Sequence, residues 1–88
     1  MNALEILKTS NIQKTSEDVD VIARQITSNP DIMDGLPVFS GTRIPVYIIL
    51  DYLAEGMSFE QILKDYPGLN KNQIRTALKF AELLTSIH

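Results

Sequence analysis

Three basic residues spaced four apart near the C-terminus are the strongest candidates for chemistry. Lys71, Arg75 and Lys79 share one side of any helix there, because four residues advance the chain by a little more than one turn. Asn72 and Thr76 lie beside them. In DNA-binding proteins arginine reads guanine, asparagine reads adenine, and lysine contacts phosphate. The spacing therefore predicts a DNA-contacting face, and the alternative interpretation is a solvated polar face.

Residues typical of catalysis are scattered and give little support for an enzyme. His88 is the single histidine and stands at the C-terminal position, which is a poor place for a general base. Asp31 and Asp34 are typical of a turn, and Ser40 has no neighbouring base and no nucleophile-elbow pattern. Cysteine and phosphate-cradling glycine motifs are absent. We therefore expect a protein that is not an enzyme and that uses neither a metal nor another cofactor.

A connector dense in glycine and proline, residues 35–46, carries one cation, Arg43. Glycine permits positive φ and proline fixes φ near −65°, so this composition predicts a tightly bent segment of defined shape. The planar guanidinium of Arg43 suits a carboxylate. In the structural interpretation Arg43 pairs with Asp34 or Asp51. In the functional interpretation it reaches an acidic site on a partner, and both interpretations remain open at this stage.

Three short helices are expected after the connector, and they must position Arg43 and the basic residues near the C-terminus. Pro45 is expected as the first residue of a helix whose apolar positions begin at Val46. Gly56 is expected to end that helix in a left-handed conformation. Ser58 and Asn70, each followed three residues later by glutamine, predict capping boxes for the next two helices. Tight joints between short helices indicate a helix-turn-helix arrangement.

The outer helices of this trio carry more apolar surface than one core requires. For the last helix, the predicted core stripe is Ile74, Ala77, Leu78, Ala81 and Leu84. The surplus apolar residues are Tyr47, Ile48 and Tyr52 in the first helix and Phe80, Leu83 and Ile87 in the last. Either the N-terminal segment covers them, or they form a protein interface, where aromatic residues are enriched. We favour an interface, because 88 residues bury only a small core.

The N-terminal part carries the β element of the predicted fold. Residues 1–23 are interpreted as an N-terminal extension that acts as an interaction arm, and residues 24–88 as the domain. The segment Asp18–Thr27 fits both helical and strand spacing, and we place a strand near Arg24–Thr27. A second small strand within Leu36–Phe39 would pair with it. The expected fold is mainly α, a three-helix helix-turn-helix core of homeodomain-like or winged type with a short N-terminal β element.

Charge and hydropathy limit the partners. The net charge of −3 divides into −4 over residues 1–56 and +1 over residues 57–88, so DNA contact has to come from the C-terminal third. No run of 18 apolar residues is present, and the N-terminus does not resemble a secretion signal. We expect a soluble cytoplasmic protein without membrane contact.

Several motifs in combination resemble the domain-of-unknown-function family 433. They are Ile26-Thr-x-x-Pro30, Gly35-x-Pro37, Gly41-Thr-Arg-Ile-Pro-Val46, Leu53-x-x-Gly56 and Tyr66-Pro-x-Leu69. The resemblance runs from about Ile26 to Ala81 and implies a compact helix-turn-helix or winged domain. It further implies an antitoxin encoded beside a PIN-like ribonuclease toxin, which masks that toxin and binds the promoter of its own operon. A homodimer would present two recognition helices about 34 Å apart.

The resemblance implies two roles, and the residue patterns above supply a surface for each. The DNA-binding residues would be Lys71, Asn72, Arg75, Thr76 and Lys79. The residues for the toxin or for a second copy would be Arg43, Tyr47, Ile48, Tyr52, Phe80, Leu83 and Ile87. Two rival hypotheses remain: a protein-only inhibitor or adaptor module that does not bind DNA, and a small metal-dependent enzyme that uses Asp31 and Asp34.

Overall fold

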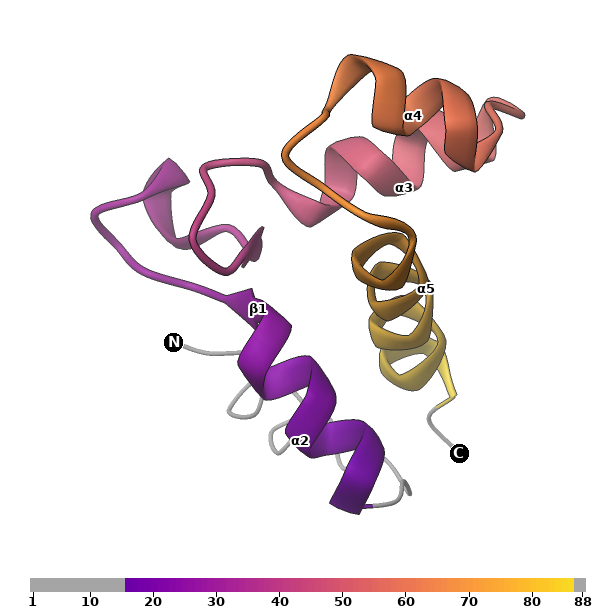
Figure 1. The fold of residues 1–88 in the computed structure, drawn as a ribbon. Coiled ribbons are helices and arrows are strands. Elements are labelled where there is room, and N and C mark those ends of the chain that lie inside the picture. The colour runs from indigo at the N-terminus through magenta and orange to yellow at the C-terminus, as the bar shows by residue number, and fades with distance from the viewer. Residues whose placement is uncertain (1–15, 87–88) are drawn as a thin grey trace.

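The computed structural model describes residues 16–86, which form a mainly helical fold with a short two-stranded sheet (Figure 1). In chain order the elements are α2 (Ser16–Gln25), β1 (Ile26–Thr27), the single turn η1 (Met33–Gly35), β2 (Val38–Phe39), α3 (Val46–Ala54), α4 (Phe59–Asp65) and α5 (Lys71–Thr85). α2 and α5 lie side by side, and α3, α4 and α5 pack against one another. None of the helices in this part of the chain is long and apolar enough to cross a membrane.

The chain passes directly from helix to strand after Gln25. β1 pairs antiparallel with β2, with Ile26 opposite Phe39, which confirms the predicted β element. The prediction of a strand at Arg24 and Gln25 is wrong, because both residues belong to α2. Helical spacing prevails there because it places Ile22, which is 1% exposed, in the core one turn before Ile26.

α2 begins within the segment interpreted as an N-terminal extension. Its Ile22 belongs to the same buried cluster as Phe80 and Leu83 of α5, and its Val19 packs against that cluster. Residues 1–15, the larger part of the arm assigned to residues 1–23, lie outside the described part of the chain.

α3 begins one residue later than expected. Pro45 has φ −68° and ψ 141°, an extended conformation, so it is the N-cap and the helix starts at Val46. Pro45 instead forms an antiparallel bridge with Val38, and the Val46 N–H donates to the Pro37 carbonyl at 2.9 Å. At the other end Gly56 has φ +90°, which confirms its predicted left-handed conformation.

The two predicted capping boxes are confirmed. Gln61 N–H donates to Ser58 Oγ at 3.2 Å, while Ser58 N–H donates to Gln61 Oε1 at 2.9 Å. The same exchange joins Asn70 and Gln73, at 2.9 and 2.8 Å. Between the two helices Leu69 is buried and anchors the turn. These reciprocal bonds fix where α5 begins and therefore which side chains its first turn presents.

The core lies where the helices and the small sheet meet. Its buried cluster consists of Ile22, Ile26, Phe39, Val46, Ile49, Ile62, Leu69, Ile74, Ala77, Phe80 and Leu83. Three expectations about α5 are wrong: Leu78, expected in the core, is 42% exposed, whereas Phe80 and Leu83, expected outside it, are 4% and 5% exposed. Since α2 packs along α5, the buried arc of α5 turns toward Phe80 and Leu83 and away from Leu78.

Candidate functional site

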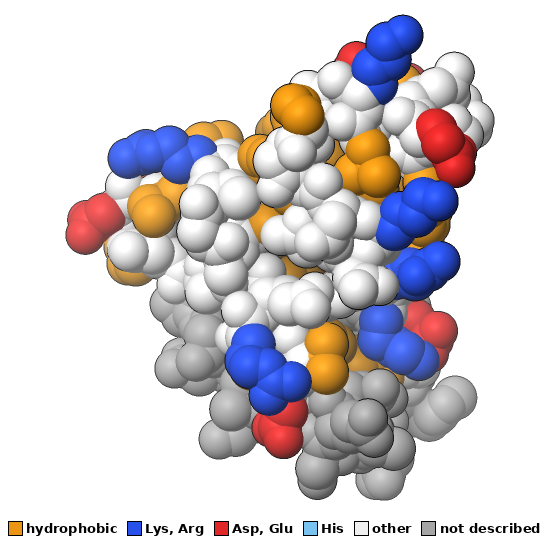
Figure 2. Space-filling view, viewed as in Figure 1, with side chains coloured by type: hydrophobic (Ala, Val, Ile, Leu, Met, Phe, Trp, Pro, Cys, Tyr) orange, Lys and Arg blue, Asp and Glu red, His pale blue; other side chains and the backbone are white. Residues whose placement is uncertain are grey.

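The N-terminal half of α5 presents most of the polar side chains that the sequence assigns to DNA. Lys71, Asn72 and Arg75 are exposed, and Lys79 is half-buried. Figure 2 shows Lys and Arg side chains following one edge of the molecule over α5. Arg75 Nη1 donates to Asn72 Oδ1 at 3.4 Å, so these two side chains lie together. We call Lys71, Asn72, Arg75 and Lys79 the α5 polar stripe.

Carboxylates lie against both ends of the α5 polar stripe. Lys71 Nζ is 3.6 Å from Glu60 Oε1, and Lys79 Nζ is 3.1 Å from Glu82 Oε1. The pKa of Glu60 lies below its ordinary value, first because its own backbone N–H donates to the carboxylate and second because of the charge of Lys71. Exposed ion pairs contribute little stability and are screened by salt. Both lysines can therefore exchange a carboxylate for a phosphate at small cost.

Thr76 does not fit the DNA-binding set that the sequence predicts. It is 7% exposed, and its hydroxyl is engaged inside the molecule rather than offered to a ligand. Thr76 Oγ1 is 2.6 Å from Gln25 Oε1 and 2.9 Å from the Asn72 carbonyl oxygen. It lies at the bottom of an open hollow between α2 and α5 that Arg75 and Lys79 also line. Thr76 therefore joins α2 to α5 beneath the α5 polar stripe.

Replacement of Thr76 by valine tests this assignment. Valine has nearly the same shape but removes the hydroxyl that bonds Gln25 Oε1, so we expect a loss of about 1–2 kcal/mol in the free energy of unfolding. Thr85→Val is the matched control, because the Thr85 hydroxyl contacts only carbonyl oxygens of its own helix. Urea denaturation should place the control within about 0.5 kcal/mol of the unchanged protein. Equal stability of both variants would contradict a role for Thr76 in joining the helices.

The apolar residues assigned to a partner divide into buried and accessible ones. Phe80 and Leu83 are 4% and 5% exposed, so the prediction that they form an exposed stripe is wrong, and the cause is the packing of α2 on α5. Tyr47, by contrast, is 55% exposed. Ile87, the third residue of the predicted stripe, lies outside the described residues.

The other two partner residues on α3 are half-buried. Ile48 remains partly exposed to solvent. Tyr52 packs on Tyr66, with ring centroids 5.8 Å apart and ring planes inclined by 46°. Hydrogen bonding to Tyr66 raises the pKa of the Tyr52 phenol above its ordinary value, with smaller contributions from the Tyr66 charge and from burial. Tyr52 therefore has a structural partner within the chain.

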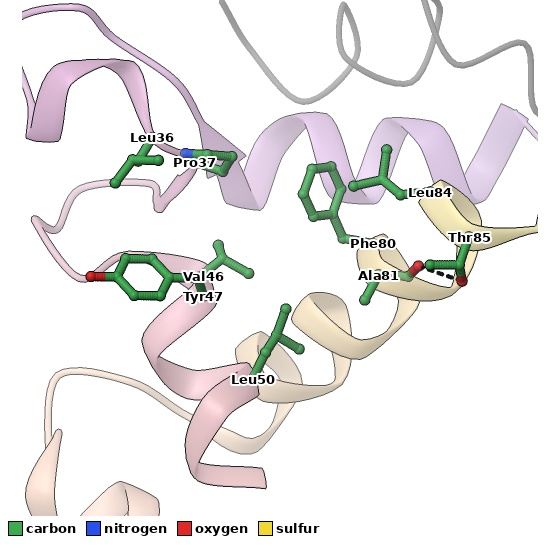
Figure 3. A pocket seen from close by; sticks show the side chains of 9 residues that line it. All are labelled: Leu36, Pro37, Val46, Tyr47, Leu50, Phe80, Ala81, Leu84 and Thr85. Carbon is green, nitrogen blue, oxygen red and sulfur yellow. Dashed lines mark hydrogen bonds between the residues drawn. The ribbon is translucent and has the colours of Figure 1, made fainter. Parts of the chain in front are cut away.

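An apolar groove between α3 and α5 lies beside the exposed Tyr47. It encloses about 290 Å³ and is lined by Leu36, Pro37, Val46, Tyr47, Leu50, Phe80, Ala81, Leu84 and Thr85. Figure 3 shows Leu36 and Tyr47 on one side and the α5 residues on the other, with the Tyr47 hydroxyl pointing away from α5. We call this set the α3–α5 groove. Sequence reasoning named Tyr47 and Phe80 but missed Leu36, whose place in the glycine- and proline-rich connector was the available signal.

Arg43 stands on a loop whose backbone is closely hydrogen-bonded. Thr42 Oγ1 donates to the Phe39 carbonyl at 2.7 Å and accepts the Ile44 N–H at 3.0 Å, and the Phe39 N–H donates to the Ile44 carbonyl at 3.1 Å. Arg43 itself is exposed. Among the side chains described in residues 19–86 no carboxylate lies within ion-pair distance of it, so the structural interpretation of a pair with Asp34 or Asp51 is wrong.

The residues considered for catalysis do not come together. Asp31 and Asp34 are exposed on the loop around η1, and the Asp31 N–H is capped by Asn29 Oδ1 at 2.9 Å. Ser40 Oγ is buried and has no hydrogen-bond partner in the described part of the chain. In that part of the chain no three His, Cys, Asp or Glu side chains are grouped as metal ligands. His88 lies outside it.

Comparison with known proteins identifies the family. The model of the family described as "Protein of unknown function (DUF433)" matches residues 26–81, which is well over half of the chain. The protein belongs to the DUF433 family. A crystal structure of a DUF433 member from Anabaena variabilis is similar over 93% of this chain and 88% of that one, with a TM-score of 0.64 and 26% sequence identity.

A curated relative in Sinorhizobium fredii, described as "Uncharacterized protein y4eO", is 41% identical over 66 residues. That match covers 75% of this chain but only 30% of the relative, so the chain spans less than a third of the longer protein. The DUF433 match includes Arg43 and the whole α5 polar stripe. It leaves out α2 as well as Leu83 and Thr85 at the end of α5, so this chain extends the family region on both sides.

Proposed function

We propose that this DUF433 protein is an antitoxin, which binds the promoter of its operon through α5 and inhibits a PIN-like ribonuclease toxin. The observation that carries the DNA-binding half is the exposed α5 polar stripe, which begins immediately after a capped helix start and is supported from behind by α3 and α4. The toxin-binding half is supported by the family resemblance. Both activities act on intracellular components, so a cytoplasmic location is part of the proposal.

The α4–turn–α5 segment supports a helix-turn-helix mode of binding. α4 ends at Asp65 and α5 begins at Lys71, and the buried Leu69 holds the short connection against the core. In such motifs the second helix enters the major groove with its N-terminal residues toward the base edges. On α5 those residues are Lys71, Asn72 and Arg75.

Each side chain of the α5 polar stripe has a matching role. The guanidinium of Arg75 can donate two hydrogen bonds to guanine, and Asn72 can pair with adenine. Lys71 and Lys79 suit phosphates on either side, once they release Glu60 and Glu82. The contact between Arg75 and Asn72 reduces the freedom of both side chains before DNA arrives.

The inhibition step follows from the chemistry of the proposed partner. A PIN-like nuclease holds Mg²⁺ with clustered carboxylates, and a protein that covers this cleft excludes both the metal and the RNA substrate. The same complex can occupy the promoter, so that the amounts of toxin and antitoxin regulate the transcription of their own operon. Co-expression with the PIN-like product of a neighbouring gene should restore growth and yield a copurifying complex.

A salt titration of the unchanged protein tests the DNA-binding half. Fluorescence anisotropy with a promoter fragment should give affinity that falls with salt, with a slope of about −2 to −3 per subunit in a plot of log affinity against log salt, as expected for two to three phosphate contacts. A scrambled fragment of equal length is the control and should bind more weakly. Absence of any preference for the promoter would contradict DNA binding by this protein.

A protein-only inhibitor or adaptor is the second candidate function. It is favoured by a specific observation, because the lysines at both ends of the α5 polar stripe already face carboxylates and the chain has a net charge of −3. This candidate predicts a tight complex with the toxin and no promoter shift in the same experiments.

A further inference from the structure

We infer that the α3–α5 groove is the interface of a symmetric homodimer, in which Tyr47 of each copy packs into the groove of the other. Exposed large hydrophobic side chains are few in the described residues: Met33, Leu36, Tyr47 and Leu78. Leu36 and Tyr47 both line the groove, and Met33 belongs to the loop that carries Leu36. Apolar groups that gather around one depression mark a surface that another macromolecule covers.

The backbone holds Leu36 at the rim of the groove at an energetic cost. The three residues before it have positive φ, namely Met33 at 51°, Asp34 at 55° and Gly35 at 85°, and two of them are not glycine. Residues other than glycine seldom adopt this conformation, and it persists only where surrounding bonds enforce it. Here the Leu36 N–H donates to the Met33 carbonyl at 3.1 Å, and Ser28 Oγ donates to the Gly35 carbonyl. The turn therefore fixes an exposed leucine beside the groove.

Charge complementarity indicates a second copy as the occupant. An isologous interface uses the same patch twice, so a projection on that patch must be matched by a depression and a charged group by one of opposite sign. Tyr47 is the projection and the groove is the depression. Arg43 lies four residues before Tyr47 and Asp51 lies one helical turn after it. Both are exposed, and neither forms an ion pair with any side chain described in residues 19–86. A two-fold axis near Tyr47 can bring Arg43 toward Asp51 of the partner subunit.

This dimer leaves the α5 polar stripe accessible. At about 100° of rotation per residue, the groove-lining residues Phe80, Ala81 and Leu84 lie on the side of α5 roughly opposite Arg75. They also lie in the C-terminal half of the helix, whereas the stripe begins in its first turn. One dimer would therefore present two α5 polar stripes. Their use in reading a palindromic operator rests on the proposed function, but the dimer itself does not.

Sedimentation of the full 88-residue chain over micromolar concentrations tests the inference. The unchanged protein should sediment as a species of about twice the chain mass. Tyr47→Asp should sediment as a monomer with unchanged helical circular dichroism, because Tyr47 is 55% exposed and supports no core. A monomeric unchanged protein, or a dimer that Tyr47→Asp leaves intact, would overturn the proposal.

A charge exchange tests the pairing within the interface. Arg43→Asp and Asp51→Arg should each weaken the dimer about tenfold or more, because each single change leaves two like charges facing each other across the two-fold axis. The double variant R43D/D51R should recover most of the lost affinity. Lys64→Asp, which reverses an exposed cation on α4, is the matched control and should leave the dimer constant unchanged. A double variant as weak as the singles would overturn the proposed arrangement.

The two proposals fail in distinguishable ways. A dimer that does not bind the promoter would refute the DNA-binding function and support the proposed dimer interface. A monomer that binds the promoter, with an affinity that falls with salt, would support the DNA-binding function and refute the proposed interface.

Discussion

Leu83→Ala is expected to lower the free energy of unfolding by about 2–3 kcal/mol, whereas Leu78→Ala should change it by less than about 1 kcal/mol. Both substitutions remove the same atoms from the same helix. Leu83 is 5% exposed and belongs to the core cluster with Ile22, so its truncation leaves a cavity between α2 and α5. Leu78 is 42% exposed, and alanine is at least as favourable as leucine in a helix.

Urea denaturation at one fixed protein concentration measures this difference. The expected loss for Leu83→Ala is a large share of the total for a small domain, about 5–10 kcal/mol, so its midpoint should move clearly below that of Leu78→Ala. The estimate lies at the lower end for a buried leucine because Leu83 is in the last turns of α5, where neighbours can collapse into the gap. A larger loss for Leu78→Ala would show that α2 does not cover α5 in solution.

This pair of leucines also marks where sequence reasoning reaches its limit. Helical periodicity correctly predicts α5, and it predicts a core stripe through Ile74 and Ala77, which are both fully buried. Periodicity alone cannot decide how far around the helix the buried arc extends, because that depends on which other element packs there. α2 precedes α5 by some 45 residues, and its docking moves the arc from Leu78 to Leu83.

Local signals were sufficient wherever the controlling bonds are local. Ser58 and Asn70 each bond a residue three positions away, so both capping boxes could be predicted from residue types. Gly56 likewise takes the positive φ that a helix end requires. Pro45 was misplaced by one position because a bridge to Val38, seven residues earlier, holds it in an extended conformation.

In the candidate site, too, features set by neighbouring residues could be predicted, and features set by distant segments could not. The spacing of Lys71, Arg75 and Lys79 was enough to predict a shared surface, since all three lie on one helix. Thr76 directly follows Arg75, but its burial depends on Gln25 of another helix and could not be predicted. The α3–α5 groove is built from three separate segments, 36–37, 46–50 and 80–85, and the last of them is far from the other two in the chain, so the fold must be known to find it.

Arg75→Ala is expected to weaken promoter binding by about 10- to 100-fold and to relax the preference for the promoter over a scrambled fragment. The reason is that Arg75 is an exposed guanidinium in the second turn of α5, where a recognition helix meets base edges. The change should not disturb the fold, because Arg75 is exposed and alanine favours helix. Anisotropy titrations with both fragments measure affinity and preference together.

Two further variants separate base reading from general electrostatics. Lys71→Ala should weaken both DNA fragments to a similar degree and reduce the salt slope by about 1, because a lysine–phosphate contact carries no sequence information. Lys64→Ala is the control for lost charge, since Lys64 is an exposed cation in the last turn of α4 and lies outside the α5 polar stripe. If Arg75→Ala and Lys64→Ala bind the promoter equally well, Arg75 does not read bases, and α5 is then better explained as a solvated surface of a protein-only inhibitor.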